Sequence, residues 1–227
     1  QTASPFGCLN NFYFKILSNF WGSLQNVTVL FYAGLFVLKG TVGFAIIKEM
    51  EREVPCVQMQ TLLPNCSVRK LQPVNADIEK IYAMASQNTL FYQYHPPFVT
   101  WQSILDDMSA LPPGKTMADK FYIGFFDGAA LAAVVDMILA YPNETTGYIG
   151  FFMVDKSRQG QGIGSRIVAD IENTMRNNGM RHSRLAVDKG NPQSYSFWTK
   201  NGYAVCGPEI PNGFSAYIPM QKELTPL

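Results

Sequence analysis

Three glycines at every second position, Gly160, Gly162 and Gly164, form the stretch of this chain that is best suited to hold an anion. An uncharged run, residues 148–154, precedes them and an amphipathic run follows, so the predicted order is strand, glycine-rich turn and helix. Backbone N–H groups of such a turn point into open space, and the N-terminus of the next helix adds partial positive charge. The pattern favours a phosphate group as the ligand.

Two other interpretations of the glycine run stay open at this level. A purely structural turn between a strand and a helix would use the same residues. A Rossmann dinucleotide site needs G-x-G-x-x-G, and Ser165 stands where the third glycine belongs. Asp188 lies roughly where a ribose-binding acid would be, but the chain after it is too short to complete a doubly wound sheet.

Asp136 is the only charged residue in the run 131–141, which we predict to be a strand. A buried carboxylate needs a hydrogen-bonding partner or a function. Asp136 is therefore both a candidate catalytic residue and a candidate structural one.

Composition limits the classes of function. The 227 residues, 47% of them hydrophobic, suffice for one domain with a sizeable core, with or without an extension. A net charge of +1 gives no global basic field, so nucleic acid is not an expected partner. The four cysteines and two histidines show no zinc-like spacing. We therefore predict no metal site and expect the thiols to be reduced.

The first 65 residues differ from the rest of the chain. No acidic residue precedes Glu49, and residues 27–47 are apolar apart from Lys39 and a few glycines and threonines. That segment is long enough to cross a bilayer, although a lysine near its middle opposes insertion. A packed extension, a membrane-associated segment and an artefact of the gene boundaries all stay open. Charges after residue 48 and the prolines that follow predict a domain boundary near residue 66.

The remaining residues predict alternating strands and helices. The order of strand, crossover helix and strand after residue 147 implies a parallel strand pair, and the three strands before the glycine run form a meander. Asp127-Gly128 predicts a type I′ hairpin turn, and residues 92–98 a loop stiffened by prolines. We expect strands at 67–73, 121–126, 131–141, 148–154, 184–187, 203–206 and 215–220, and helices from Asn75 and at 101–111, 162–178 and 192–202.

Residues from about 66 to 224 resemble the GNAT superfamily of acyl-CoA-dependent N-acyltransferases. The match covers an order of elements as well as a short signature. The signature R/Q-x-x-G-x-G/A matches residues 159–164, the hydrophobic fourth strand matches 149–154, the asparagine at a helix start matches Asn191, and the aromatic helix ending in K-x-G-[FY] matches 197–203.

The resemblance implies an α/β (α+β) fold. Its sheet would be mixed and mostly antiparallel, with flanking helices and a parallel strand pair at the acyl-CoA site. Residues 66–227 would form the GNAT-like domain, and residues 1–65 a hydrophobic extension of unknown role.

The resemblance also implies acetyl-CoA as co-substrate, without a metal. Backbone amides of the glycine-rich turn and a serine hydroxyl would hold the CoA pyrophosphate, and the pantetheine arm would lie between the fourth and fifth strands, which splay apart. The cofactor-binding residues expected on this basis are Met153, Val154, Gln159, Gly160, Gln161, Gly162, Ile163, Gly164, Ser165 and Asn191.

In the family's reaction, a substrate amine attacks the thioester directly, without a covalent enzyme intermediate. Many members protonate the departing thiolate with a tyrosine whose position here is Trp198, an indole that is no useful acid. Tyr195, one turn earlier on the same face, is the candidate acid, and a packing role or an unaided thiolate stays open. His95 lies where the family builds the acceptor site, so it is a candidate substrate contact or a loop-packing residue.

The predicted function is acetyl transfer from acetyl-CoA to an amine by a cytoplasmic enzyme. The alternatives are a non-catalytic acyl-CoA-binding module, suggested by Trp198, and a membrane-tethered acyltransferase, suggested by residues 27–47. The acceptor would be a small-molecule or peptide amine, and a polyamine, an antibiotic, an amino acid and a protein N-terminus all fit. Homodimer formation stays open.

If residues 66–227 hold the whole core, a chain that starts near Val54 should fold and bind acetyl-CoA. The reason is the shift in composition at Glu49 and the prolines after it. Thermal melting and calorimetry with acetyl-CoA measure both properties. An insoluble or unfolded product would mean that the N-terminal segment packs into the core.

Overall fold

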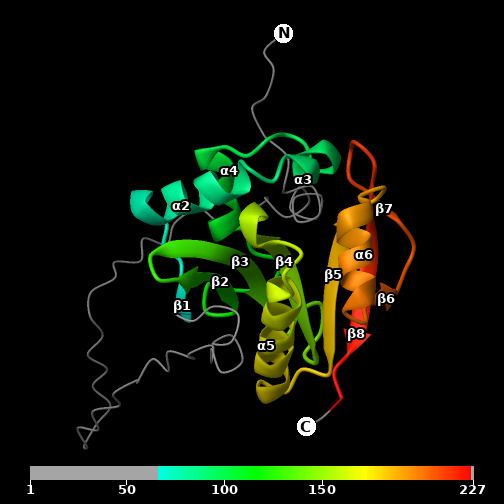
Figure 1. Ribbon diagram of the computed structural model, residues 1–227. Coiled ribbons are helices and arrows are strands. Elements are labelled where there is room, and N and C mark those ends of the chain that lie inside the picture. Colours follow the sequence, from blue (N-terminus) through cyan, green and yellow to red (C-terminus); the bar gives the residue numbers. More distant parts are fainter. Residues whose placement is uncertain (1–65, 226–227) are drawn as a thin grey trace, which may run out of the picture.

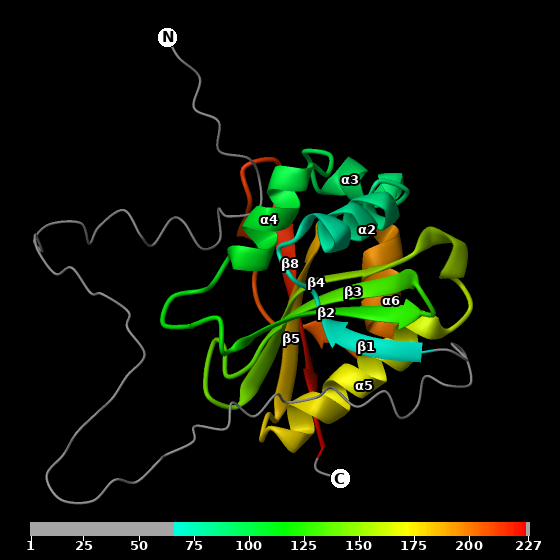
Figure 2. The same ribbon diagram turned by 90° about the vertical axis from the view of Figure 1, so that its left-hand side faces the viewer.

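The computed structural model describes residues 66–225, so the predicted extension, residues 1–65, lies outside the described part of the chain. The described residues form one eight-stranded sheet in the order β1-β2-β3-β4-β5-β8-β6, with β7 paired to β8. Helices α2, α3 and α4 gather on one side of it, and α5 and α6 on the other (Figures 1 and 2). Most strand pairs are antiparallel and β4–β5 is parallel, as predicted.

The observed elements follow the predicted order closely. The strands are β1 (Cys66–Lys70), β2 (Lys120–Asp127), β3 (Ala130–Ile138), β4 (Thr146–Val154), β5 (His182–Asp188), β6 (Ala204–Val205), β7 (Ile210–Pro211) and β8 (Ala216–Glu223). The helices are α2 (Asn75–Ala85), α3 (Thr89–Tyr94), α4 (Trp101–Ser109), the 3-10 turn η3 (Lys156–Arg158), α5 (Ile163–Asn177) and α6 (Pro192–Lys200).

The larger core lies between the sheet and helices α5 and α6. Ile167, Ile171 and Met175 recur every four residues along α5 and are fully buried there. Val135 and Met137 of β3 reach this core, because alternate residues of a strand point to opposite faces. The hydrophobic pattern that predicted the α5 helix therefore also identifies the face that packs on the sheet.

A second core lies on the opposite face, beneath α2 and α4. Ile78, Ile81 and Met84 of α2 pack with Ile104 and Met108 of α4. The sheet contributes Tyr122, Val134 and Met153, among other residues. Burial on both faces explains why β3 reads as an almost continuous apolar run.

The parallel strands β4 and β5 pair only at one end. Their partners are Thr146 with His182, Gly147 with Ser183, and Tyr148 with Arg184. After these three residues each strand continues without pairing to the other, although β5 stays paired with β8 along its whole length. The sheet is therefore split by a cleft whose closed end lies at Tyr148 and Arg184.

Several local predictions were wrong in detail. Asp127 pairs with Ala130, so the hairpin loop is Gly128-Ala129, and only Gly128 has a positive φ. A type I′ turn needs positive φ at both loop residues, so the turn is of another type. The predicted loop at 92–98 begins inside α3, and β7 was not predicted.

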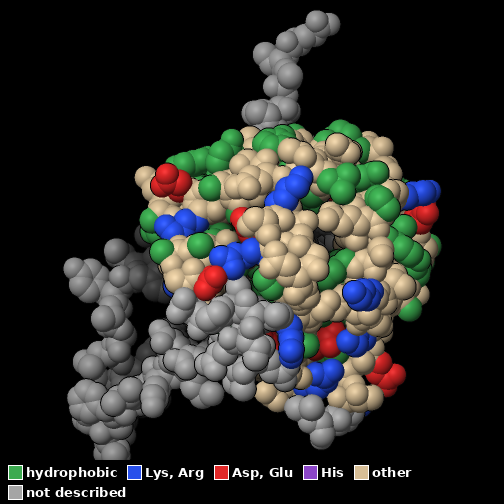
Figure 3. All heavy atoms as spheres, in the orientation of Figure 1, with side chains coloured by type: hydrophobic (Ala, Val, Ile, Leu, Met, Phe, Trp, Pro, Cys, Tyr) green, Lys and Arg blue, Asp and Glu red, His purple; other side chains and the backbone are tan. Residues whose placement is uncertain are grey.

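The remaining sequence-based expectations concern thiols, membranes and charge. Cys66 is disulfide-bonded, so the expectation of reduced thiols does not hold for it. Among residues 66–225, none of the helices has the length and apolar character that a membrane span needs. Acidic and basic side chains are interspersed on the face that carries α5 and α6 (Figure 3).

Candidate active site

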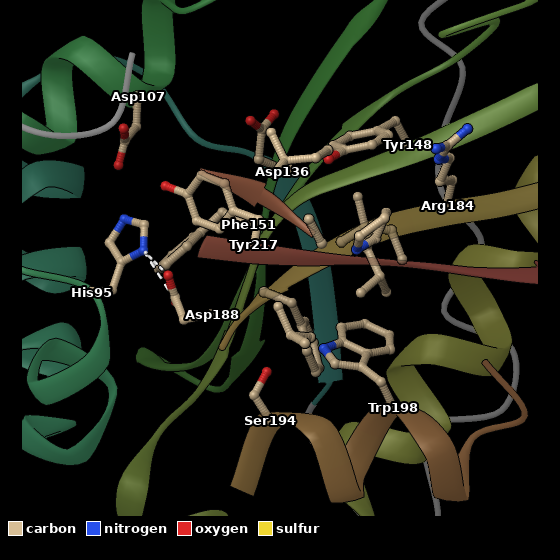
Figure 4. Close-up of a pocket in the computed structure, with 18 of the residues that line it drawn as sticks. His95, Asp107, Asp136, Tyr148, Phe151, Arg184, Asp188, Ser194, Trp198 and Tyr217 are labelled. Atoms are coloured by element: carbon tan, nitrogen blue, oxygen red, sulfur yellow. Dashed lines mark hydrogen bonds and ion pairs between the residues drawn. The ribbon is translucent and has the colours of Figure 1, made fainter. Parts of the chain in front are cut away.

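A cavity of about 290 Å³ occupies the cleft between the separated halves of β4 and β5 (Figure 4). Residues 149–152 of β4 form one wall and residues 185–188 of β5 the other. The ends of the cavity are lined by α3 and α4 on one side of the sheet and by Ser194 and Trp198 of α6 on the other. The cavity thus passes through the sheet where its backbone ladder is interrupted.

The glycine-rich turn lies between η3 and α5. Gly160 and Gly162 have φ of +75° and +83°, a region that side chains disfavour. Gly162 is the N-cap of α5, and no side chain caps the first turn of that helix. The N–H groups of this turn are therefore the ones that an anion could satisfy.

Gln159 connects the turn to three other parts of the molecule. Its Nε2 donates to the carbonyl of Val154 at 3.0 Å and to Oδ1 of Asn88 at 2.6 Å. Its Oε1 accepts from Gln193 of α6 at 3.1 Å. Gln161 binds more locally, to the carbonyl of Ser157. These contacts hold the start of the glycine-rich turn at the end of β4.

Gly164 differs from the other two glycines of the turn. A Cβ placed there would lie 3.0 Å from a ring carbon of Phe197 on α6, whereas a Cβ at Gly162 would meet no atom within 4 Å. The close approach of α5 to α6 therefore requires Gly164, and the backbone conformation requires Gly162.

The backbone of β4 offers hydrogen-bonding groups to the cleft at alternate residues. The N–H of Asp155 donates to Ala132 of β3, so Asp155 and Met153 point their backbone groups toward β3. Antiparallel pairing then directs the groups of Phe152 and Val154 to the open edge. The predicted contact residues Met153 and Val154 are thus separated: Met153 faces β3, and Phe152 takes its place at the cleft.

Asp136 of β3 lies beneath the cavity and is 8% exposed. Its Oδ2 accepts from Nζ of the buried Lys120 at 2.7 Å, and its Oδ1 has no partner in the described structure. A bulge in β4 places Gly150 above it, where an added Cβ would lie 2.9 Å from Oδ2. Burial raises the pKa of Asp136 to about 6, and the charge of Lys120 limits that rise.

His95 follows α3 and is bonded to the end of β5. Its Nδ1 lies 3.0 Å and 3.1 Å from the two carboxylate oxygens of Asp188. The ring stacks on Phe91, with 5.0 Å between ring centroids. Nε2 is buried and has no partner in the described structure. His95 thus packs in the loop and also lines the cavity, and its contact with a substrate stays a prediction.

The predicted residues of α6 are only partly at the cavity. Tyr195 is 42% exposed and is not among the lining residues, unlike Trp198. Asn191 caps α6 by accepting from the N–H of Ser194 at 3.1 Å, as its position predicted. Trp198 packs at 5.6 Å from the ring of Phe152, so this indole joins α6 to the wall of the cleft.

Sequence reasoning missed several polar residues that line the cavity, among them Asp107, Tyr148, Arg184 and Asp188. Asp107 lies three residues after Ile104 on α4, and this helical spacing could have placed it on the buried face. Burial raises the pKa of Asp107 to about 8, the nearby Asp136 adds to the rise, and Lys120 opposes it. The position of Asp188 at the end of a strand suggests only a ribose ligand from the sequence.

The model of the acetyltransferase (GNAT) family matches residues 81–203, which is more than half of the chain. This protein therefore belongs to the GNAT acetyltransferase family and is an acyltransferase. The family was predicted from the sequence, and the match confirms it. No curated protein sequence matches the chain.

Solved structures support the fold. Ard1 from Thermoplasma volcanium has a TM-score of 0.54 at 21% identity, over 71% of this chain and 99% of that chain. The ribosomal-protein-S18-alanine N-acetyltransferase from Escherichia coli has a TM-score of 0.52 at 13% identity, over 71% and 96%. PaiA N-acetyltransferase from Thermoplasma acidophilum, solved in complex with coenzyme A, has a TM-score of 0.51 at 19% identity, over 70% and 98%.

Replacing Lys120 by Met should destabilise the protein by about 3–5 kcal/mol above pH 7, because it leaves the buried Asp136 carboxylate without its cation. Loss of that cation raises the pKa of Asp136 further. The carboxyl group is then neutral near pH 5, and the loss should be smaller there.

Chemical denaturation of the Lys120→Met variant at pH 5 and pH 8 measures this difference. Lys70→Met, on the exposed end of β1, is the matched control and should change the free energy of unfolding by less than about 0.5 kcal/mol. An equal loss at both pH values would contradict the role of the ion pair.

Proposed function

We propose that this protein transfers an acetyl group from acetyl-CoA to an amine, by direct attack of the amine on the thioester. The observation that carries the proposal is the cleft between β4 and β5, which begins after three paired residues and is walled by the strand that precedes the glycine-rich turn. An extended, narrow ligand with an anionic end fits this arrangement, because one strand edge and one set of free N–H groups meet there.

The cofactor would be held by backbone groups more than by side chains. Residues of the turn from Gln159 to Gly164, with the Ser165 hydroxyl, would bind the pyrophosphate. The open-edge groups of Phe152 and the N–H of Val154 would pair with the pantetheine arm, while the carbonyl of Val154 is already bonded to Gln159. Asn191 would act mainly by fixing the start of α6, since its side chain is used as a cap.

Asp136 is the general base of this proposal. Asp136 lines the cavity, its Oδ1 has no partner in the described structure, and a pKa of about 6 leaves the carboxyl group ionised at neutral pH. The carboxylate would take a proton from the substrate ammonium, and the amine would then attack the thioester carbon. Breaking of the C–S bond releases the thiolate of CoA.

The proton for that thiolate has no assigned donor on α6. Trp198 lines the cavity but is not an acid, and Tyr195 lies outside the lining. The role of Tyr195 as general acid stays a prediction. Its exposed position favours the alternative in which the thiolate leaves without a general acid.

Replacing Gly162 by Val should abolish acetyl-CoA binding, because a branched side chain opposes the positive φ that shapes the turn. Gly128→Val is the matched control. Gly128 has φ of +60° in a hairpin loop outside the cavity lining, so the variant should lose stability but keep its affinity for acetyl-CoA. Calorimetry measures both. Unchanged affinity in a folded Gly162→Val variant would remove the central claim.

Replacing Asp136 by Asn should lower kcat by about 10²–10⁴-fold, which is the usual contribution of a general base. In the wild-type protein kcat should rise as the pH rises through about 6, since only the ionised carboxyl accepts a proton. This rise of kcat with pH should be absent in the Asp136→Asn variant. Asp170→Asn, a buried carboxyl of α5 outside the cavity lining, should keep it. If kcat of the Asp136→Asn variant still rose with pH through about 6, the general base would be another group.

A further inference from the structure

Among the described residues, charge is unevenly distributed along the cavity. Three aspartates, Asp107, Asp136 and Asp188, line it together with one cationic side chain, Arg184. Arg184 belongs to the closed end of the cleft, where it pairs with Tyr148. Asp188 lies four residues further along β5, roughly 13 Å at the rise of a strand. Figure 4 shows Arg184 beside Tyr148 and away from His95, Asp188 and Asp107.

Asp136 is neutralised by Lys120, whereas Asp107 is not paired in this way. The Asp107 carboxylate forms no hydrogen bond or ion pair within residues 66–225, and it lines the cavity from α4. Burial desolvates this carboxylate, and no cation lies at bonding distance from it within the described residues. Desolvation is the main cause of its raised pKa. A cation in the cavity would stabilise its ionised form.

His95 lines the same cavity and adds a buried ring nitrogen to it. Because the carboxylate of Asp188 can only accept, the hydrogen of that pair resides on Nδ1, and in the neutral ring Nε2 is then an acceptor. The side chain of His95 is only 10% exposed, and Nε2 has no partner in the described structure. A buried acceptor without a partner costs free energy unless a ligand donates to it.

The walls around these groups are aromatic. Phe91 stacks on the ring of His95, and the centroid of the Tyr217 ring lies 6.2 Å from that of His95. In Figure 4 His95, Asp107 and Tyr217 surround one part of the cavity. Carboxylates and aromatic faces together suit a cationic N–H donor, and they do not suit an anion.

We propose that this end of the cavity, defined by His95, Asp107 and Asp188, binds a second cationic group of the acceptor. The substrates would then be diamines or polyamines. The inference rests on the proposed acetyl transfer: one ammonium group is held at His95 and Asp107 while the other amine reacts beside Asp136.

The test compares a series of α,ω-diamines with alkylamines of the same carbon number, using acetyl-CoA and release of free thiol as the readout. At the length that spans the two positions, kcat/KM for the diamine should exceed that for the monoamine by at least about tenfold. This is what one hydrogen bond to a charged group supplies.

Two variants should bring this ratio toward one. Asp107→Asn removes the carboxylate. Asp188→Asn removes the negative charge beside the ring of His95, while its amide can still form a hydrogen bond to Nδ1. Asp106→Asn is the matched control on the same helix. Asp106 is bonded to Gln102 and does not line the cavity, so that variant should keep the wild-type ratio.

Calorimetry with acetyl-CoA shows which variants are folded. If one of the two variants no longer binds acetyl-CoA, the comparison uses the other variant alone. A ratio near one at every length in the wild-type protein would overturn the inference. So would a ratio that survives both substitutions. A wild-type protein that neither binds acetyl-CoA nor acetylates any amine would overturn the proposed function instead.

Discussion

The separation of β4 from β5 is the constraint on which the rest of this structure depends. Parallel strands normally continue their hydrogen bonds, and a buried strand edge without partners is costly. Here the pairing ends after Tyr148 and Arg184, and the bulge at Gly150 turns β4 at that point. Helix α6 packs Trp198 against the wall of the opening, and β8 holds β5 along its whole length. The cleft is therefore held open by packing on both of its sides.

Two buried pairs of titratable side chains lie around this opening. The ion pair of Lys120 with Asp136 lies beneath the sheet, and the pair of His95 with Asp188 joins α3 to β5 across the cavity. Each pair leaves one polar atom, Oδ1 of Asp136 and Nε2 of His95, without a partner in the described structure. Such atoms reduce stability in a protein that binds nothing, so their retention at one cavity fits a site in which a ligand completes the bonding.

The sequence was sufficient for the family, the sheet and the position of the glycine-rich turn, because each depends on local periodicity or on residues close together in the chain. The helix pattern of Ile167 and Ile171 and the cap at Asn191 are examples. The site was harder to predict. His95 and Asp188 are 93 residues apart, and no local pattern links them. The replacement of Met153 by Phe152 at the cleft depends on strand register, where a shift of one residue reverses every backbone group.

The unpaired edges of β4 and β5 have a consequence for how the protein avoids aggregation. Exposed strand edges are templates for pairing with other chains, and natural proteins protect them. In this molecule the two edges face each other inside the sheet, and α3 and α6 flank the space between them. A strand from another molecule would have to bring its side chains between these helices to reach the edges. A thin flexible chain without side chains can enter more easily. The arrangement thus keeps a backbone edge available for recognition without offering it to a neighbouring sheet.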